Sequence, residues 1–232
     1  MMNKSILVVA AHPDDEALGC GGTIAKHTSN GDDVHVLIIT EGVTSRDYGN
    51  EEPSRADKLK KLSYSAQKAN DILGVKSLKI LGFPDNRLDS IDRLDVIKAI
   101  EEHASKIAPQ IIYSHSDTDL NIDHRIVNEA VLTAFRPIPN STIEKIFFFE
   151  VPSSTGWNQT ISANNFIANS FEDISSTLSI KLKSLKEYEM EMRDWPHARS
   201  LRGIEYLAKY RGALVGLEAA EAFYLARNII RK

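Results

Sequence analysis

The stretch SILVVAAHPDDEALG, residues 5–19, joins an apolar run directly to an acidic turn. The apolar run, residues 6–11, is far shorter than the roughly 20 apolar residues of a membrane span, and charged residues follow it at once. It therefore predicts a buried strand. Open α/β sheets form their ligand crevices at the carboxyl ends of parallel strands, so the turn after this strand is a candidate functional site.

Strand-like and helix-like segments alternate along the rest of the chain. This alternation predicts an α/β fold, a Rossmann-like three-layer sandwich with a mostly parallel sheet. Residues 152–232 differ from the preceding chain in composition, because charged amphipathic segments follow a Ser- and Asn-rich stretch. We interpret them as a helical C-terminal extension lying on a core of about residues 1–151, so that residues 1–232 form a single domain. We expect strands at 5–10, 34–40, 78–83, 111–114 and 145–151, and helices at 17–29, 54–73, 91–107, 125–135, 180–192 and 198–210.

The composition is that of an ordinary globular chain of 232 residues, with 42% hydrophobic and 26% charged residues. A net charge of −4 gives no electrostatic reason to expect nucleic acid or an anionic membrane as partner, so we expect a small-molecule ligand. The single cysteine, Cys20, excludes an internal disulfide, and no apolar run is long enough for a membrane span. We therefore expect a cytoplasmic protein, whose amphipathic C-terminal helices offer a surface for a homo-oligomer.

The turn after the first predicted strand carries His12, Asp14, Asp15 and Glu16. Pro13 fixes its own φ and lacks an N–H, so it stiffens the turn and aims His12 and Asp15 toward one point. An imidazole nitrogen and a carboxylate oxygen suit Zn²⁺, which binds such ligands at about 2.0–2.2 Å. Acidic residues also cap helices, but capping explains one of these residues and not the whole group. The turn therefore predicts part of a zinc site.

A second polar cluster, HSDTDLNIDH at residues 115–124, follows another predicted strand and precedes a helix. A catalytic zinc site usually takes three protein ligands, so one more ligand is expected from this cluster. Either His124 or His115 can supply it. Asp123 is expected to hold an imidazole by its other ring nitrogen, as ligand histidines usually require, or to cap the helix.

The segment GCGG at residues 19–22 does not have the spacing of a dinucleotide-binding loop, and the acidic residues before it would repel a pyrophosphate. We therefore disfavour a nucleotide-binding module. Small residues here predict close packing of the first helix on the sheet. Cys20 is expected to be a buried thiol, with metal binding as the less favoured role.

The segments AHPDDE (residues 11–16) and NIDH (residues 121–124), with the α/β order between them, resemble the LmbE-like, or PIG-L, family of zinc-dependent N-acetylglucosaminyl deacetylases. The resemblance covers about residues 5–150. It implies that His12, Asp15 and His124 are the metal ligands and that Asp14 is the general base.

The chain departs from this family at Asn121, where the family usually has a histidine that is thought to help stabilise the charged intermediate. An asparagine donates hydrogen bonds but cannot carry a proton or a positive charge. We expect Asn121 to assist the reaction as a hydrogen-bond donor, with His115 as the group that compensates for the missing histidine.

The resemblance implies zinc-dependent hydrolysis of the acetamide of an N-acetylated amino sugar or sugar conjugate, giving acetate and a free amine. Zinc lowers the pKa of a bound water from 15.7 toward about 7, and Asp14 takes the proton. One alternative is a zinc hydrolase of another small N-acyl metabolite. Another is a metal- or sugar-binding relative with reduced catalysis, because Asn121 replaces the histidine.

Several other polar residues have a weaker connection to the site. They follow predicted strands or turns, where they can reach a substrate but are equally well explained as caps, turn residues or surface ion pairs. These residues are Arg55, Asp85, Asn86, Arg87, Glu150 and His197. Three histidines within regular elements are expected to be structural, namely His27, His35 and His103.

Overall fold

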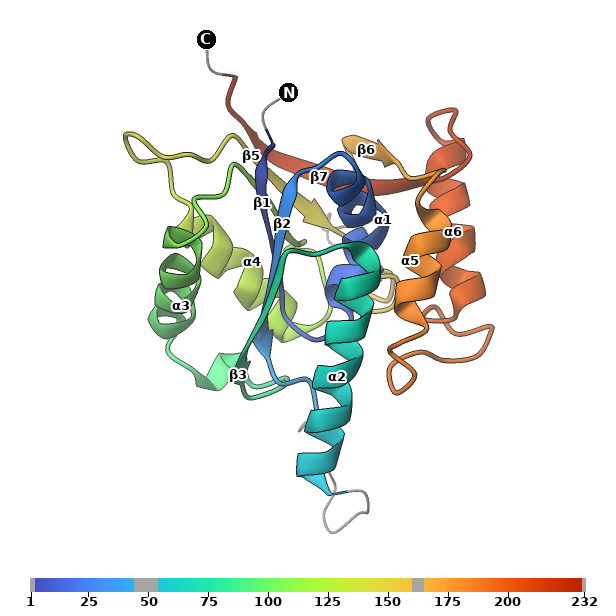
Figure 1. Ribbon diagram of the computed structural model, residues 1–232, viewed down its shortest axis with the longest axis horizontal. Helices are drawn as coiled ribbons and strands as arrows, with labels where there is room; N and C mark the ends of the chain where they lie inside the picture. The colour runs from blue at the N-terminus through green and yellow to red at the C-terminus, as the bar shows by residue number, and fades with distance from the viewer. Residues whose placement is uncertain (1–2, 44–53, 160–164, 231–232) are drawn as a thin grey trace.

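A computed structural model describes residues 3–43, 54–159 and 165–230 of the chain. Seven of its strands form one sheet in the order β3-β2-β1-β4-β5-β7-β6 (Figure 1). The first five strands in this order are parallel, whereas β7 pairs antiparallel with both β5 and β6. Within these ranges no helix is both long and apolar enough to cross a membrane.

The strands are β1 (Ser5–Ala10), β2 (Asp33–Thr40), β3 (Ser77–Phe83), β4 (Ile111–His115), β5 (Lys145–Phe149), β6 (Ser170–Asp173) and β7 (Ala220–Asn228). The α-helices are α1 (Asp15–Ser29), α2 (Arg55–Leu73), α3 (Arg93–Ser105), α4 (Ile122–Ala134), α5 (Leu178–Leu185) and α6 (Leu201–Ala213), and a short 3-10 helix, η2 (Leu88–Ser90), precedes α3.

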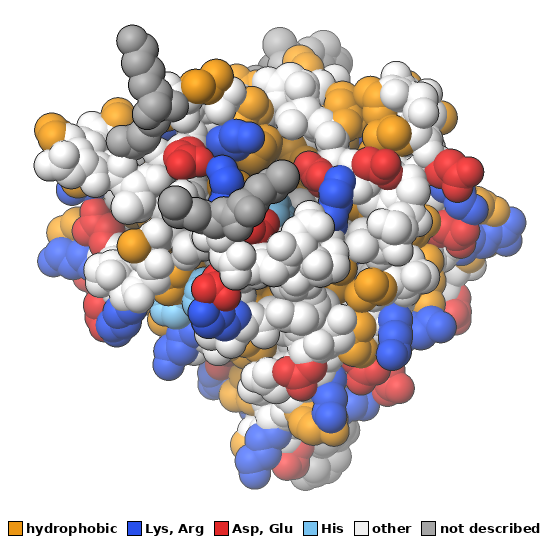
Figure 2. All heavy atoms as spheres, turned by 45° about the horizontal axis from the view of Figure 1, so that its top comes forward, with side chains coloured by type: hydrophobic (Ala, Val, Ile, Leu, Met, Phe, Trp, Pro, Cys, Tyr) orange, Lys and Arg blue, Asp and Glu red, His pale blue; other side chains and the backbone are white. Residues whose placement is uncertain are grey.

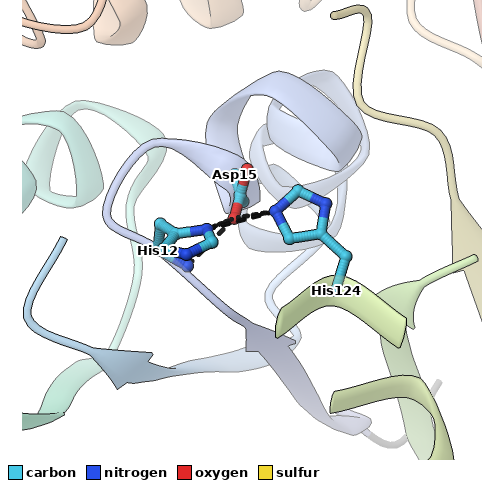
Figure 3. A group of neighbouring side chains, drawn as sticks. All are labelled: His12, Asp15 and His124. Atoms are coloured by element: carbon cyan, nitrogen blue, oxygen red, sulfur yellow. Dashed lines mark hydrogen bonds and ion pairs between the residues drawn. The ribbon is translucent and has the colours of Figure 1, made fainter. Parts of the chain in front are cut away.

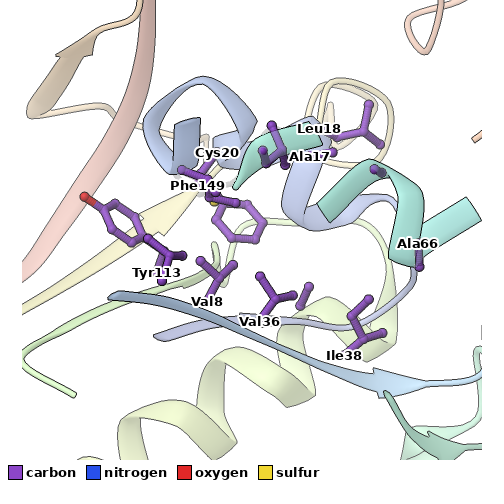
Figure 4. Close-up of a cluster of buried hydrophobic side chains, with 14 of the residues drawn as sticks. Val8, Ala17, Leu18, Cys20, Val36, Ile38, Ala66, Tyr113 and Phe149 are labelled. Atoms are coloured by element: carbon purple, nitrogen blue, oxygen red, sulfur yellow. The ribbon is translucent and has the colours of Figure 1, made fainter. Parts of the chain in front are cut away.

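Strand β1 lies inside the sheet, and its side chains alternate between two apolar cores. Ile6 and Val8 pack in the core under α1, α2, α5 and α6. Leu7 and Val9 pack on the opposite face under α3 and α4. Figure 4 shows the first core, where Val8 and Val36 of neighbouring strands lie below the helices. Helices on both faces of a mostly parallel sheet confirm the predicted three-layer sandwich.

The C-terminal part differs in detail from the expected helical extension. Its two helices are present, but the predicted helix over 180–192 ends at Leu185, and the chain then turns. The prediction also missed β6 and β7, and β7 pairs with β5 in the same sheet as β1. The end of α5 has a tertiary consequence, because Tyr188 in the following turn donates its hydroxyl hydrogen to Glu16.

Helix α1 packs closely on its neighbours because of its glycines. A Cβ on Gly19 would lie 2.2 Å from the ring of Phe149, and a Cβ on Gly22 would lie 2.8 Å from Ile174. Between them the helix kinks at Cys20, which has non-helical φ and ψ of −144° and 25°. The expected close packing of these small residues is therefore confirmed.

Two buried side chains of the C-terminal part bind the backbone at this kink. Glu221 accepts hydrogen bonds from the N–H groups of Gly22 and Thr23, at 2.9 and 2.7 Å. Lys181 donates to the carbonyl of Leu18 at 2.8 Å and forms an ion pair with Glu221. A kink would otherwise leave these backbone groups without partners inside the protein.

We expect Glu221→Gln to lower the free energy of unfolding by about 3–5 kcal/mol, because it leaves the Lys181 ammonium buried without its counter-charge. Urea denaturation measures the change. The control is Glu205→Gln, which breaks the exposed pair of Glu205 with Lys209 and should leave the midpoint nearly unchanged. Equal effects of the two variants would show that the buried pair does not stabilise the kink.

Candidate metal centre and active site

The two predicted polar clusters meet at the carboxyl edge of the sheet. The first spans the turn after β1 and the first turn of α1, and the second spans the end of β4 and the first turn of α4. Since β1 and β4 are neighbouring parallel strands, their carboxyl ends are adjacent. The fold therefore brings together residues that are 112 positions apart, such as His12 and His124.

Three side-chain atoms converge in the centre of this site, as Figure 3 shows. His12 Nδ1, His124 Nε2 and Asp15 Oδ2 lie 3.1 Å from one another in every pairing. Asp15 and His124 are fully buried and His12 is 9% exposed. These are the three residues expected to bind the metal, and their atoms form one compact triangle.

This triangle fits a tetrahedral metal ion. Zinc ligands at about 2.0–2.2 Å lie roughly 3.3–3.6 Å apart, so separations of 3.1 Å need only a small outward movement. Asp15 Oδ1 is buried and has no hydrogen-bond partner among the described residues. A cation would compensate this buried carboxylate, and two imidazoles with one carboxylate leave a fourth position open.

The outer ring nitrogen of His12 is held by acidic residues. His12 Nε2 lies 3.1 Å from Asp123 Oδ2 and 3.2 Å from Asp85 Oδ1. Asp123 is itself fixed by the N–H groups of Asn86 and Leu88, at 2.7 and 3.0 Å. This arrangement directs Nδ1 of His12 toward the triangle. Asp123 thus holds an imidazole as expected, and the imidazole belongs to His12.

His124 is held in the same way by Asp119, to which the sequence analysis gave no role. His124 Nδ1 lies 3.0 Å from Asp119 Oδ2, which also accepts hydrogen bonds from Ser154 and Thr155 at 3.0 and 2.6 Å. Burial lowers the pKa of His124, but the carboxylates of Asp15 and Asp119 outweigh it and raise the pKa to about 9.

We expect zinc affinity to increase by at least about tenfold for each pH unit between pH 6 and pH 9. Burial lowers the pKa of His12, but hydrogen bonds to nearby carboxylates outweigh it and raise the pKa, so this second ligand makes the dependence steeper. An imidazolium has no lone pair for a metal, so His124 must lose its proton before zinc binds, and below its pKa protons compete with zinc. Competition with a chromogenic chelator at several pH values measures the dissociation constant. A constant that does not change above pH 7 would contradict this prediction.

His115 is buried behind the triangle. Its Nε2 accepts a hydrogen bond from the Ala11 N–H at 2.8 Å, and its ring stacks on His124 with centroids 3.9 Å apart. Asn128 donates to its carbonyl at 2.8 Å. It is fully buried and is not among the residues that line the pocket beside His12. This position favours support of the β1 turn over the compensating catalytic role that we expected.

Asp14 occupies the N-cap position of α1 in the left-handed region, with φ of 119°, but its side chain makes no capping hydrogen bond. Glu16 accepts a hydrogen bond from the Asp14 N–H at 3.1 Å and is held in turn by Asn70 and Tyr188. The side-chain oxygen Oδ2 of Asp14 accepts a hydrogen bond from Arg199 at 2.8 Å. Burial raises the pKa of Asp14 well above its usual value; Arg199 opposes this shift and the carboxylate of Asp15 adds to it.

A small pocket opens beside the triangle. Asn121 lies on its wall and caps α4, with Oδ1 accepting from the Asp123 N–H and Nδ2 donating to Asn86 Oδ1, both at 2.8 Å. The wall is mostly polar and carries both acidic and basic groups. The lining residues are His12, Pro13, Asp14, Gly42, Asp85, Asn86, Asn121, Glu191 and Arg199.

Of the more weakly expected residues, only Asp85 and Asn86 line this pocket. Arg55 pairs with Glu41, and Glu150 pairs with Arg211. His197 packs against Trp157, Arg87 precedes η2, and the Cys20 thiol is buried against the carbonyl of Glu16.

Two charged pocket residues, Glu191 and Arg199, were not predicted. They follow the last predicted strand by at least 40 positions in a segment without a motif, so only the folded chain reveals them.

Figure 2 shows acidic and basic groups interspersed over the face that it presents, without a broad patch of one sign. Such a face offers nucleic acid no continuous basic stripe.

Comparison with known proteins relates this geometry to deacetylases. Residues 7–135 match the family described as GlcNAc-PI de-N-acetylase, PIG-L. The diacetylchitobiose deacetylase of Thermococcus kodakarensis is 29% identical over 245 residues, which cover 97% of this chain and 84% of that protein. A probable N-acetyl-alpha-D-glucosaminyl L-malate deacetylase 2 of Bacillus cereus is 31% identical over 60% of this chain and 64% of its own length.

The fold is also found in a solved structure. The N,N'-diacetylchitobiose deacetylase from Pyrococcus horikoshii superimposes with a TM-score of 0.78 at 20% identity, covering 97% of this chain and 84% of that one.

Proposed function

Because the chain belongs to the PIG-L family of GlcNAc-PI de-N-acetylases, we propose that it hydrolyses the acetamide of an N-acetylated amino sugar or sugar conjugate. The products are acetate and a free amine. The observation that carries the proposal is the triangle of His12, Asp15 and His124 with Asp14 beside it on the pocket wall.

We infer that zinc is the metal, because two imidazoles and one carboxylate at tetrahedral spacing match its ligand preferences. When bound, zinc supplies Lewis-acid polarisation of the acetyl carbonyl and lowers the pKa of water. His12 and His124 keep their ligand nitrogens directed inward because Asp123 and Asp119 hold the opposite nitrogens.

In the proposed reaction Asp14 moves the proton. Its carboxylate accepts a proton from the attacking water, and the oxygen of that water forms a bond to the acetyl carbon. The same proton then passes from Asp14 to the amine nitrogen as the C–N bond breaks. The amine leaves neutral and the acetyl group leaves as acetic acid, which releases its remaining proton to solvent to give acetate. One carboxylate thus serves first as base and then as acid.

Asn121 lies where it can contribute a hydrogen bond to the substrate. Its Nδ2 already donates to Asn86 Oδ1, and the amide has a second N–H for a further acceptor. We propose that this N–H binds an oxygen of the substrate, in place of the charged donor that a histidine would provide.

An acetate-release screen tests the proposed function. The substrates are N-acetylglucosamine, diacetylchitobiose, GlcNAc-malate and a simple N-acyl amine, each with added zinc and with Asp14→Asn as control. Release of acetate from a sugar, abolished by Asp14→Asn, supports the proposal. Release from the simple amine alone supports the hydrolase of another N-acyl metabolite, and sugar binding without release supports the relative with reduced catalysis.

A further inference from the structure

Arg199 connects the C-terminal part of the chain to the expected general base. It lies just before α6, outside residues 7–135 that match the family. Its Nη1 donates to Asp14 Oδ2 at 2.8 Å, across 185 positions of the sequence. Both residues line the pocket. The contact therefore involves the carboxylate on which the proposed proton transfer depends.

The guanidinium of Arg199 is fixed from several sides. Its Nε donates to Ser153 Oγ at 2.9 Å, and Nη1 lies 3.5 Å from Glu191 Oε2. The backbone N–H of Arg199 donates to His197 Nδ1 at 3.0 Å. With a side chain only 16% exposed, Arg199 has little freedom to move away from Asp14. A group held this firmly can impose an orientation on its partner.

We propose that Arg199 is a positioning residue that holds the Asp14 carboxylate in the orientation for proton transfer; this inference rests on the proposed function. Arg199 binds Oδ2, and no described residue donates a hydrogen bond to Oδ1, which is left for the attacking water. The backbone of Asp14 is fixed separately through its N–H by Glu16. Together these contacts restrict the backbone and the carboxylate of Asp14.

The planar shape of arginine is needed for this arrangement. Nε binds Ser153 while Nη1 binds Asp14, so the two hydrogen bonds come from different atoms of one rigid group. A lysine has a single nitrogen on a flexible stem and cannot reproduce both contacts in the same geometry. We therefore expect Arg199→Lys to behave more like Arg199→Met than like the wild type.

The first experiment measures steady-state kinetics of acetate release and zinc content. Arg199→Met should lower kcat by on the order of 10²-fold, with a small change in KM and with zinc retained. In Arg199→Ala, which leaves space for the ion, guanidinium added far below unfolding concentrations should restore part of kcat. The matched control is Arg202→Met, since Arg202 lies three residues away and packs on Trp195 and Tyr206. Wild-type kcat in Arg199→Met, or a change confined to KM, would overturn the proposal.

The second experiment needs no activity. Thermal unfolding is compared for the wild type, Asp14→Asn, Arg199→Met and the double variant. Asp14→Asn should lower the melting temperature in the wild-type background, where it removes the carboxylate that Arg199 binds at 2.8 Å. It should raise the melting temperature in the Arg199→Met background, where it removes an uncompensated buried carboxylate. The same change in both backgrounds would show that the two side chains are not coupled and would overturn the proposal.

The two experiments separate this inference from the proposed function. If the wild type releases no acetate from any substrate, the proposed function fails, and the thermal cycle still decides whether Arg199 and Asp14 are coupled. If the wild type is active and the cycle shows no coupling, the proposed function stands and the role of Arg199 is rejected.

Discussion

Asp14→Asn should lower the rate of acetate release by about 10²–10⁴-fold while zinc remains bound. The substitution keeps the size of the side chain but replaces a carboxylate oxygen with an N–H₂ group, which cannot accept the proton of the attacking water. The metal triangle consists of other residues, so the zinc content should not change. Steady-state kinetics and elemental analysis on the same sample measure both quantities.

The control for Asp14→Asn is Asp117→Asn, which makes the same chemical change at an exposed position of the second polar cluster, residues 115–124. It should leave both rate and zinc content at wild-type levels. A fully active Asp14→Asn enzyme would remove Asp14 from the mechanism. Loss of zinc in this variant would instead show that Asp14 supports the metal site.

The parallel part of the sheet was predictable because its strands carry strong local signals. In β5 the run KIFFF is buried on nearly every position, as a strand covered on both faces must be. β7 gave no comparable signal. Its first half, Ala220-Glu221-Ala222, has the composition of a helix, and only its second half alternates between exposed and half-buried positions. Its strand conformation follows from pairing with β5 and β6, which are distant in the sequence.

The same distinction applies to the site. The ligand residues lie in two short motifs directly after strands, so their spacing indicated a metal centre. Asp119 lies five residues before His124 in the same polar cluster, so its position was a usable signal for a partner of that histidine. Arg199 and Glu191 had no such signal, because only the turns after α5 bring them to Asp14.

The C-terminal part therefore contributes to the site as well as to the fold. Tyr188 and Arg199 both reach the first motif, one through Glu16 and the other through Asp14. Lys181 and Glu221 hold the kink that follows that motif. A chain cut after β5 would lose all four contacts, so we infer that residues beyond the family match are required to keep the motif in its active arrangement.

His124→Ala should remove most of the zinc from the purified protein. It deletes one of three donor atoms and leaves only His12 and Asp15, which come from a single turn. The variant also leaves Asp119 buried without the imidazole that it holds. Replacing an outer partner of a metal ligand usually weakens binding by 10–100-fold, so loss of a ligand itself should weaken zinc binding by more than this. Elemental analysis and chelator competition measure the content and the affinity.

Two further variants make this result specific. His35→Ala removes a histidine whose ring is hydrogen-bonded to Ser77 on β3, outside the triangle, and it should retain zinc. His115→Ala removes the ring that stacks on His124, and we expect it to retain zinc because His115 Nε2 accepts from the Ala11 N–H. If His124→Ala retained full zinc and His115→Ala lost it, the third ligand would be His115.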